Sequence, residues 1–150
     1  MQTRFNIKTV APGALKAMAG LEVYLSQSSI SRTIKELIKI RASQINGCAF
    51  CINMHTQDAI KNGETNQRIF LLTAWREAGA IFTEEERVVL AITEEITLIH
   101  QGGLSADTYA NALKFFSEAQ IADIITAVVT INVWNRVVLS TQLQIGESMV

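Results

Sequence analysis

Two cysteines and a histidine stand close together in the chain, at the spacing C-x-x-C-x-x-x-H. On an α-helix, Cys48, Cys51 and His55 fall within about 60° of one another, so both thiols and the imidazole share one face. Cysteines at positions i and i+3 of a helix are close enough for a disulfide to form between them. Asn46-Gly47 ends the preceding helix and places Cys48 in the first turn of the next, where unpaired N–H groups favour a thiolate. This pattern indicates a redox centre, and from spacing alone Cys48 is the nucleophile.

The sequence leaves other interpretations of the cysteine pair open. The cysteines could be small core residues, or the pair could exchange disulfides with another protein. Cys48, Cys51 and His55 could also bind zinc with Glu36 as a fourth ligand, although structural zinc sites usually draw their ligands from two separated segments. A thioredoxin fold is disfavoured, because the motif follows a predicted helix and not a strand.

The composition describes a small, apolar and nearly neutral protein. The chain has 150 residues, of which 49% are apolar and 18% charged, and its net charge is -1. This length suits a single domain over residues 1–150. Without a basic excess, neither nucleic acid nor an anionic membrane is expected as a partner. The apolar excess predicts that part of the surface is buried against other copies of the chain.

The chain shows no sign of a targeting or membrane-spanning segment. Residues 1–16 lack an uninterrupted apolar run, and the longest apolar stretch, Ile121 to Leu139, contains Asp123 and Arg136. Two closely spaced cysteines are too few for a secreted disulfide framework. We therefore expect a cytoplasmic protein.

The elements that must position the motif are predicted to be helices. Apolar residues recur near the helical period, and turn residues are sparse. Val128 to Val133 is β-prone by composition, but its register and the capping signals at Thr83 and Ser117 favour helix. We predict an all-α bundle of about six to seven helices. They cover 12–26, 31–45, the cysteines to 62, 66–78, a segment from 84 that ends before 102, and segments that follow Ser105 and Ser117.

Glu36 lies on the side of its predicted helix opposite the apolar positions Ile34, Leu37 and Ile38. It could therefore face solvent, or complete a capping box with Thr33. Ile40, Ser43 and Gly47 share its direction, however, and a stripe of mostly small residues allows another helix to approach closely. A close approach by another helix would bury Glu36 and give it a role in the site.

The motif resembles a known family. Glu36, eleven intervening residues and then C-x-x-C-x-x-x-H, within NGCAFCINMHTQDAIKNGET, is similar to the alkylhydroperoxidase D-like branch of the carboxymuconolactone decarboxylase family. The similarity continues through Trp75-Arg-Glu-Ala and Phe82-Thr-x-x-Glu86-Arg87, and Asn132-Val-Trp134-Asn135-Arg136 resembles the C-terminal helix of the family. The resemblance covers residues 32–140 and implies an all-helical fold that assembles as a trimer or hexamer.

This resemblance implies a peroxidase for organic hydroperoxides that acts in antioxidant defence. Cys51 would be the peroxidatic thiolate, and Cys48 would resolve its sulfenic acid as an intramolecular disulfide. Glu36 and His55 would form the proton relay. The resemblance further implies that no haem, flavin or metal is required and that an external dithiol, a lipoylated protein in the best-known member, reduces the disulfide. Decarboxylation is a weaker alternative, because the cysteine pair marks the peroxidase-like branch.

One position departs from the family pattern, and the C-terminal helix is ambiguous. The founding peroxidase has a histidine in its relay where this chain has Phe50. The other histidine, His100, is predicted to lie near a helix end and receives no role. Asn132, Asn135 and Arg136 continue the apolar face of their helix, which predicts either a structural network or a pocket or subunit interface. In the first case Arg136 would pair with Glu94 or Glu95, and in the second Trp134 or Asn135 would line the site.

Overall fold

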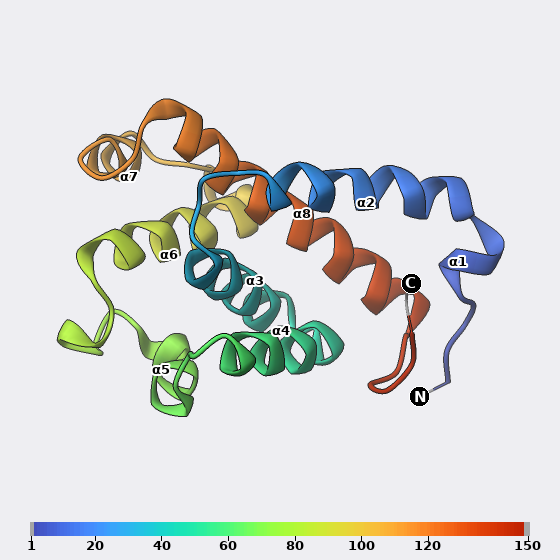
Figure 1. Ribbon diagram of the computed structural model, residues 1–150. Coiled ribbons are helices and arrows are strands. Elements are labelled where there is room, and N and C mark those ends of the chain that lie inside the picture. Colours follow the sequence, from blue (N-terminus) through green and yellow to red (C-terminus); the bar gives the residue numbers. More distant parts are fainter. Residues whose placement is uncertain (1, 149–150) are drawn as a thin grey trace.

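The computed structural model describes residues 2–148, and within that range the chain is helical, without a strand (Figure 1). This confirms the predicted all-α fold. The α-helices are α1 (Ile7–Val10), α2 (Pro12–Ser26), α3 (Arg32–Asn46), α4 (Ala49–Lys61), α5 (Asn66–Leu71), α6 (Glu84–Thr97), α7 (Ala106–Ala112) and α8 (Glu118–Thr141).

Side-chain caps set most helix starts where the sequence predicts them. Ser31 and Ser105 each accept a backbone N–H at the start of α3 and α7. Thr83 and Ser117 form reciprocal capping boxes with the side chains three residues further on. Each box satisfies two otherwise unpaired N–H donors at the start of its helix, α6 or α8. The β-prone segment from Val128 to Val133 lies within α8 and is helical, as predicted.

Two segments differ from the prediction, and a third ends before Gly102 as predicted but in two parts. The structure adds the four-residue helix α1, whose start is capped by Asn6. The segment predicted as one helix over 66–78 ends its α-helical part at Leu71 and continues as a 3₁₀ turn over Leu72–Ala74. Helix α6 ends at Thr97, and a separate 3₁₀ turn follows at Ile99–Gln101. These short turns depend on local backbone hydrogen bonds that hydrophobic periodicity does not encode.

Helices α3 and α8 form the centre of the molecule (Figure 1). Helix α3 packs against α4, α6 and α8, and α8 also packs against α2 and α6. The larger apolar core lies among α2, α3, α6 and α8 and includes both cysteines. A second apolar cluster lies under α5, around Leu72, Trp75 and Phe82. The redox motif is thus part of the core and is not presented on a surface loop.

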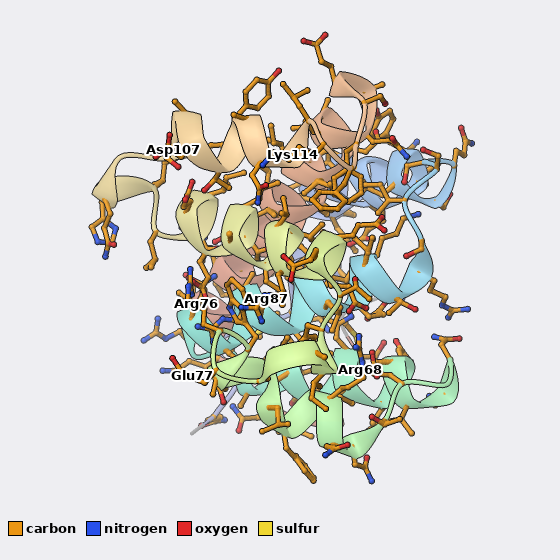
Figure 2. All side chains as sticks on the ribbon, turned by 90° about the vertical axis from the view of Figure 1, so that its left-hand side faces the viewer. Arg68, Arg76, Glu77, Arg87, Asp107 and Lys114 are labelled. Atoms are coloured by element: carbon orange, nitrogen blue, oxygen red, sulfur yellow. A yellow bond between two sulfur atoms is a disulfide. The ribbon has the colours of Figure 1, made fainter. Side chains whose placement is uncertain are left out.

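The residues after the cysteine motif that resemble the family make structural contacts away from the cysteines. The guanidinium groups of Arg76 and Arg87 lie 4.2 and 5.4 Å from the ring of Trp75 (Figure 2). Arg68 forms a 2.6 Å ion pair with Glu86. A hollow of about 530 Å³ opens on this face between α6 and α7, but none of the predicted redox residues lines it. These contacts therefore support the fold and give no sign of a second site.

Helix α8 is long and apolar enough to cross a membrane by length and composition. However, 61% of its most apolar window is buried inside the molecule. This is the pattern of a core helix, and it fits a soluble protein.

Candidate redox site

A glycine turn between α3 and α4 places the first cysteine. Gly47 adopts the left-handed conformation, with φ of 70°, and ends α3. The backbone N–H groups of Gly47 and Cys48 then donate to Gln44 and Ser43, which satisfies two carbonyls at the end of the helix. Because the chain reverses within one residue, Cys48 begins the next helix directly beside the end of α3.

Cys48 caps the N-terminus of α4, one position earlier than the predicted place within its first turn. Helix α4 begins at Ala49, and the Cys48 Sγ accepts the backbone N–H of Cys51 at 3.4 Å. The predicted N-terminal environment is confirmed in this form. A cap position exposes the sulfur to the unpaired N–H groups of the first turn, which stabilise negative charge there.

Cys48 and Cys51 are joined in a disulfide, with their α-carbons 5.4 Å apart. The two residues are 0% and 1% exposed, so water has almost no direct access to either sulfur in this state. Within residues 2–148, no set of three His, Cys, Asp or Glu side chains is grouped so that it could hold a metal ion. The distance between the two cysteines is within the range that a disulfide spans.

Glu36 and His55 meet across the packed faces of α3 and α4. The Glu36 Oε2 lies 3.0 Å from His55 Nδ1, and both residues are buried. Because a carboxylate can only accept a hydrogen bond, Nδ1 is the donor and a neutral imidazole keeps Nε2 as its acceptor. His55 lies one turn after Cys51 on α4, on the same face of that helix.

The structure shows which of the predicted surroundings Glu36 has. Ser31, and not Thr33, caps α3, and Glu36 is buried, so the capping-box and solvent-facing interpretations are both wrong. Ile40 and Ser43 on the same stripe are fully buried, as expected where a second helix approaches closely. Helix α4 is that helix, and it carries His55.

The pKa of Glu36 is lowered although the residue is buried. Burial alone would raise the pKa of this carboxyl, because it penalises the charged form. The hydrogen bond from His55 lowers the pKa most, the charges of Lys39 and Arg32 lower it further, as does that of His55 when its ring is protonated, and together these effects outweigh burial. Glu36 is therefore held as a carboxylate that can accept from His55.

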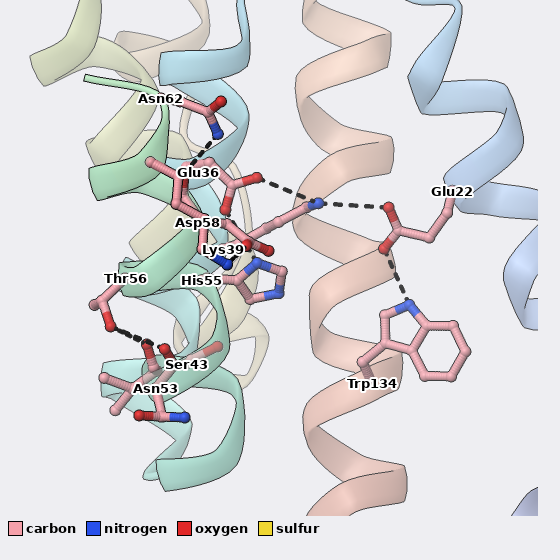
Figure 3. A network of polar contacts seen from close by, with 12 residues as sticks. Glu22, Glu36, Lys39, Ser43, Asn53, His55, Thr56, Asp58, Asn62 and Trp134 are labelled. Atoms are coloured by element: carbon pink, nitrogen blue, oxygen red, sulfur yellow. Dashed lines mark hydrogen bonds and ion pairs between the residues drawn. The ribbon is translucent and has the colours of Figure 1, made fainter. Parts of the chain in front are cut away.

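Lys39, Glu22 and Trp134 extend this pair into a longer polar chain (Figure 3). Lys39 Nζ lies 3.8 Å from Glu36 Oε1 and 3.5 Å from Glu22 Oε2, and Trp134 Nε1 donates to Glu22 Oε1 at 3.1 Å. Lys39 and Glu22 did not emerge from the sequence. The spacing of Lys39, three residues after Glu36 on one helix, is the signal that could have identified it.

A second polar network fixes the end of α3, immediately before the cysteines. Asn46 donates to Asn132 and Asn135 on α8, at 3.0 and 2.8 Å, and Asn135 donates to Ser43 at 3.0 Å. This confirms a structural network at these asparagines. The predicted pairing of Arg136 with Glu94 or Glu95 is wrong, because Arg136 donates to Asn132.

Glu94 and Glu95, the predicted partners of Arg136, bind elsewhere. Glu94 accepts from Trp75, Arg41 and Arg76. Glu95 accepts from Ser105 and Thr108, at the start of α7. Both carboxylates therefore bind groups other than Arg136. The spacing of residues on α6 and α8 could not reveal these partners, because they lie on other segments of the chain.

A groove adjoins the N-terminus of α4, between that helix and the C-terminal turn. Its volume is about 370 Å³, and Phe50, which replaces the relay histidine of the founding peroxidase, lies along it. No residue of the lining is charged. We call this hollow the Cys48 groove; it is lined by Gly47, Cys48, Ala49, Phe50, Val138, Leu139, Gln142, Leu143, Gln144 and Ile145.

Three further residues that the sequence singled out are His100, Trp134 and Asn135, and within residues 2–148 none of them has a hydrogen bond to the cysteines. His100 is exposed in a 3₁₀ turn before Gly102-Gly103, near a helix end as predicted. Trp134 is buried and bonded to Glu22, and Asn135 is fully buried in the network at the end of α3. Both side chains therefore make hydrogen bonds within the chain, Trp134 to the polar chain that includes Glu36 and Asn135 to the end of α3.

The fold and the site define a helical protein with a buried cysteine pair in its core, and comparison with known proteins gives its family. The model of the carboxymuconolactone decarboxylase family matches residues 11–95. The uncharacterized protein YdfG of Bacillus subtilis (strain 168) is 45% identical over 137 residues, which are 91% of this chain and 92% of that protein. The chain belongs to the carboxymuconolactone decarboxylase family, in its alkylhydroperoxidase D-like branch.

Solved structures agree with this assignment. A protein of Agrobacterium tumefaciens, described as a candidate antioxidant defence protein AhpD, is 36% identical with a TM-score of 0.93, covering 98% of this chain and 100% of that one. The debrominase Bmp8 is 19% identical with a TM-score of 0.79, covering 92% of this chain and 73% of that one. The second likeness shows the fold alone, and a fold can support different reactions. The activity must therefore be argued from the site.

Proposed function

We propose that this protein is a thiol peroxidase that reduces organic hydroperoxides through the Cys48–Cys51 pair. The observation that carries this proposal is the disulfide at the start of α4, which lies one turn before His55 and its buried hydrogen bond to Glu36. The family, and the relative described as a candidate antioxidant defence protein, support a peroxidase-related role.

The reaction begins with the reduced pair. The Cys51 thiolate attacks the O–O bond of the hydroperoxide, takes one oxygen as a sulfenic acid, and releases the alkoxide, which is protonated to an alcohol. The Cys48 thiol then attacks the sulfenic sulfur, a disulfide forms, and water leaves. An external dithiol reduces that disulfide by exchange and becomes a disulfide itself. The sum is one hydroperoxide and one dithiol converted to alcohol, water and a new disulfide.

His55 and Glu36 supply the proton transfers in this scheme. His55 Nε2, left as an acceptor by the bond from Nδ1 to Glu36, takes the Cys51 proton and returns it to the leaving oxygen. Glu36 fixes the tautomer and stabilises the imidazolium that forms between those two steps. This geometry supports Cys51 as the peroxidatic residue, because His55 lies one helical turn from Cys51 and two turns from Cys48. Cys48, which receives the N–H of Cys51, serves as the resolving thiol.

The surroundings of the sulfurs support a small, weakly charged substrate. Both cysteines are buried, so a small hydroperoxide needs less opening of the fold than the disulfide of a protein partner. The uncharged Cys48 groove fits a hydrocarbon group. We place the protein in the cytoplasm as a homo-oligomer, a trimer or hexamer, with a dithiol such as a lipoylated protein as its electron donor and without a bound cofactor.

The first test counts free thiols in fully reduced protein before and after one equivalent of cumene hydroperoxide. We expect both thiols to disappear together, with an intact mass lower by two hydrogen atoms. Cys48→Ser should stop at a Cys51 sulfenic acid, and Cys51→Ser should leave Cys48 unreacted. Survival of both wild-type thiols, or full dithiol-dependent turnover in both variants, would refute the proposal.

A further inference from the structure

A chain of five polar side chains crosses the molecule from α8 to α4 (Figure 3). Trp134 donates to one oxygen of Glu22, and the other oxygen of Glu22 faces the ammonium group of Lys39. Lys39 lies in turn 3.8 Å from Glu36 Oε1, while Glu36 Oε2 accepts a hydrogen bond from His55 Nδ1. Each carboxylate therefore gives one oxygen to each of its two neighbours.

Lys39 is shielded from water at the point where it meets Glu36. Their side chains are 14% and 11% exposed, respectively. An ion pair in such surroundings is screened less than one on the open surface. The ammonium group is also held from the side of α2, because it lies 3.5 Å from Glu22, and Glu22 accepts a hydrogen bond from Trp134 on α8.

Other charged groups surround Glu36, but their positions differ from that of Lys39. Arg32 lies on α3 one turn before Glu36 and adds a more distant positive charge. Asp58 on α4 and Glu22 on α2 line the same cavity, of about 500 Å³, and are negative. Glu64 borders a smaller hollow on the other side of Glu36. Asp58 and Glu64 pair with Lys61 and Arg68, respectively, whereas the ammonium group of Lys39 lies between Glu22 and Glu36.

We propose that Lys39 is a positioning residue for the redox centre, which keeps Glu36 an oriented carboxylate with one oxygen directed at His55. This inference rests on the proposed function, in which His55 accepts the proton of Cys51. Without Lys39, the Oε1 atom loses its partner while the residue stays buried. The carboxyl then gains a proton more readily and can turn away from the imidazole.

The direction of the pKa of Glu36 agrees with this role. Burial raises the pKa, whereas the hydrogen bond from His55 lowers it most and the charges of Lys39 and Arg32 add to that effect, so the pKa lies below its ordinary value. Removing the positive charge of Lys39 removes one of the forces that lower it. A protonated Glu36 no longer attracts Nδ1–H as a charge, so His55 becomes a weaker base for the thiol.

The test measures iodoacetamide alkylation of the Cys51 thiol against pH, in reduced protein with the Cys48→Ser background. We expect Lys39→Met to shift the acid limb of the profile to higher pH and to slow alkylation about fivefold at pH 6. Lys39→Arg keeps the charge and should restore the rate to within about twofold. Lys35→Met is the matched control, because Lys35 lies one turn away on α3 and its ammonium group donates to the Leu25 carbonyl.

The outcomes separate this inference from the proposed peroxidase activity. Alkylation needs no hydroperoxide, so an inactive wild type in the peroxide assay refutes the activity and leaves the role of Lys39 testable. A Lys39→Met profile that overlays the wild type in a folded protein would overturn the inference, as would an equal shift in Lys35→Met. If thermal melting shows that Lys39→Met does not fold, Lys39→Gln removes the same charge with a polar side chain and must show the same shift.

Discussion

At the scale of single residues, Glu36 combines burial with a hydrogen bond to His55. We expect Glu36→Gln to slow the reaction of reduced protein with cumene hydroperoxide by about a hundredfold, because a neutral amide cannot stabilise the imidazolium that accepts the thiol proton. Stopped-flow measurement of thiol loss checks this. Glu84→Gln, at an exposed position at the start of α6, should react like the wild type. A wild-type rate in Glu36→Gln would remove this residue from the relay.

The same carboxylate makes folding stability depend on pH. The pKa of Glu36 in the folded protein lies below its ordinary value of 4.5, so the folded state favours the ionised form. Its contribution is fully present above pH 4.5 and is lost as the pH falls through the lowered pKa. Urea unfolding should therefore show wild type losing more stability than Glu36→Gln below pH 4.5. Glu94, whose pKa is also lowered, is present in both proteins and cancels in the comparison.

At the scale of elements, the turn between α3 and α4 can be tested through Gly47. Its φ of 70° is unfavourable for a residue with a Cβ, but an added Cβ would meet no atom within 4 Å. Gly47→Ala should thus cost only backbone strain, about 1–2 kcal/mol of unfolding free energy, as urea denaturation would measure. Gly20→Ala, inside α2 with equally open surroundings, should be neutral or stabilising. Equal stability of the two variants would mean that the left-handed turn is not required.

The elements also show how far the sequence could predict this site. Ser31, Thr83 and Ser117 act through hydrogen bonds within a few residues, so local patterns located the helices that they start. Cys51 and His55 lie on α4 and Cys48 caps its start, so helical geometry alone grouped the three residues. The bond from Trp134 to Glu22, by contrast, joins residues 112 apart in the chain. Helix periodicity does not determine which faces of α2 and α8 meet, so this part of the site required the structure.

At the scale of the whole molecule, the two ends of the chain are joined beside the Cys48 groove. The backbone N–H of Arg4 donates to the Thr141 carbonyl at 2.8 Å, and the Thr3 hydroxyl bonds to the Gln142 carbonyl and the Glu147 carboxylate. In Figure 1 the N- and C-terminal segments lie on the same side of the molecule. Residues of the C-terminal turn also line the groove, so the terminal contacts hold one of its walls.

This arrangement predicts that the terminal contacts control access to the disulfide. Because both cysteines are buried, a reductant reaches them only when the structure opens locally, and a weaker terminal contact lowers the free energy of that opening. Thr3→Ala should therefore speed reduction of the disulfide by dithiothreitol severalfold while the melting temperature changes little. Thr9→Ala, an exposed position on the same N-terminal segment, should match the wild type. An unchanged rate in Thr3→Ala would indicate that access depends on another part of the fold, such as the packing of α2 on α8.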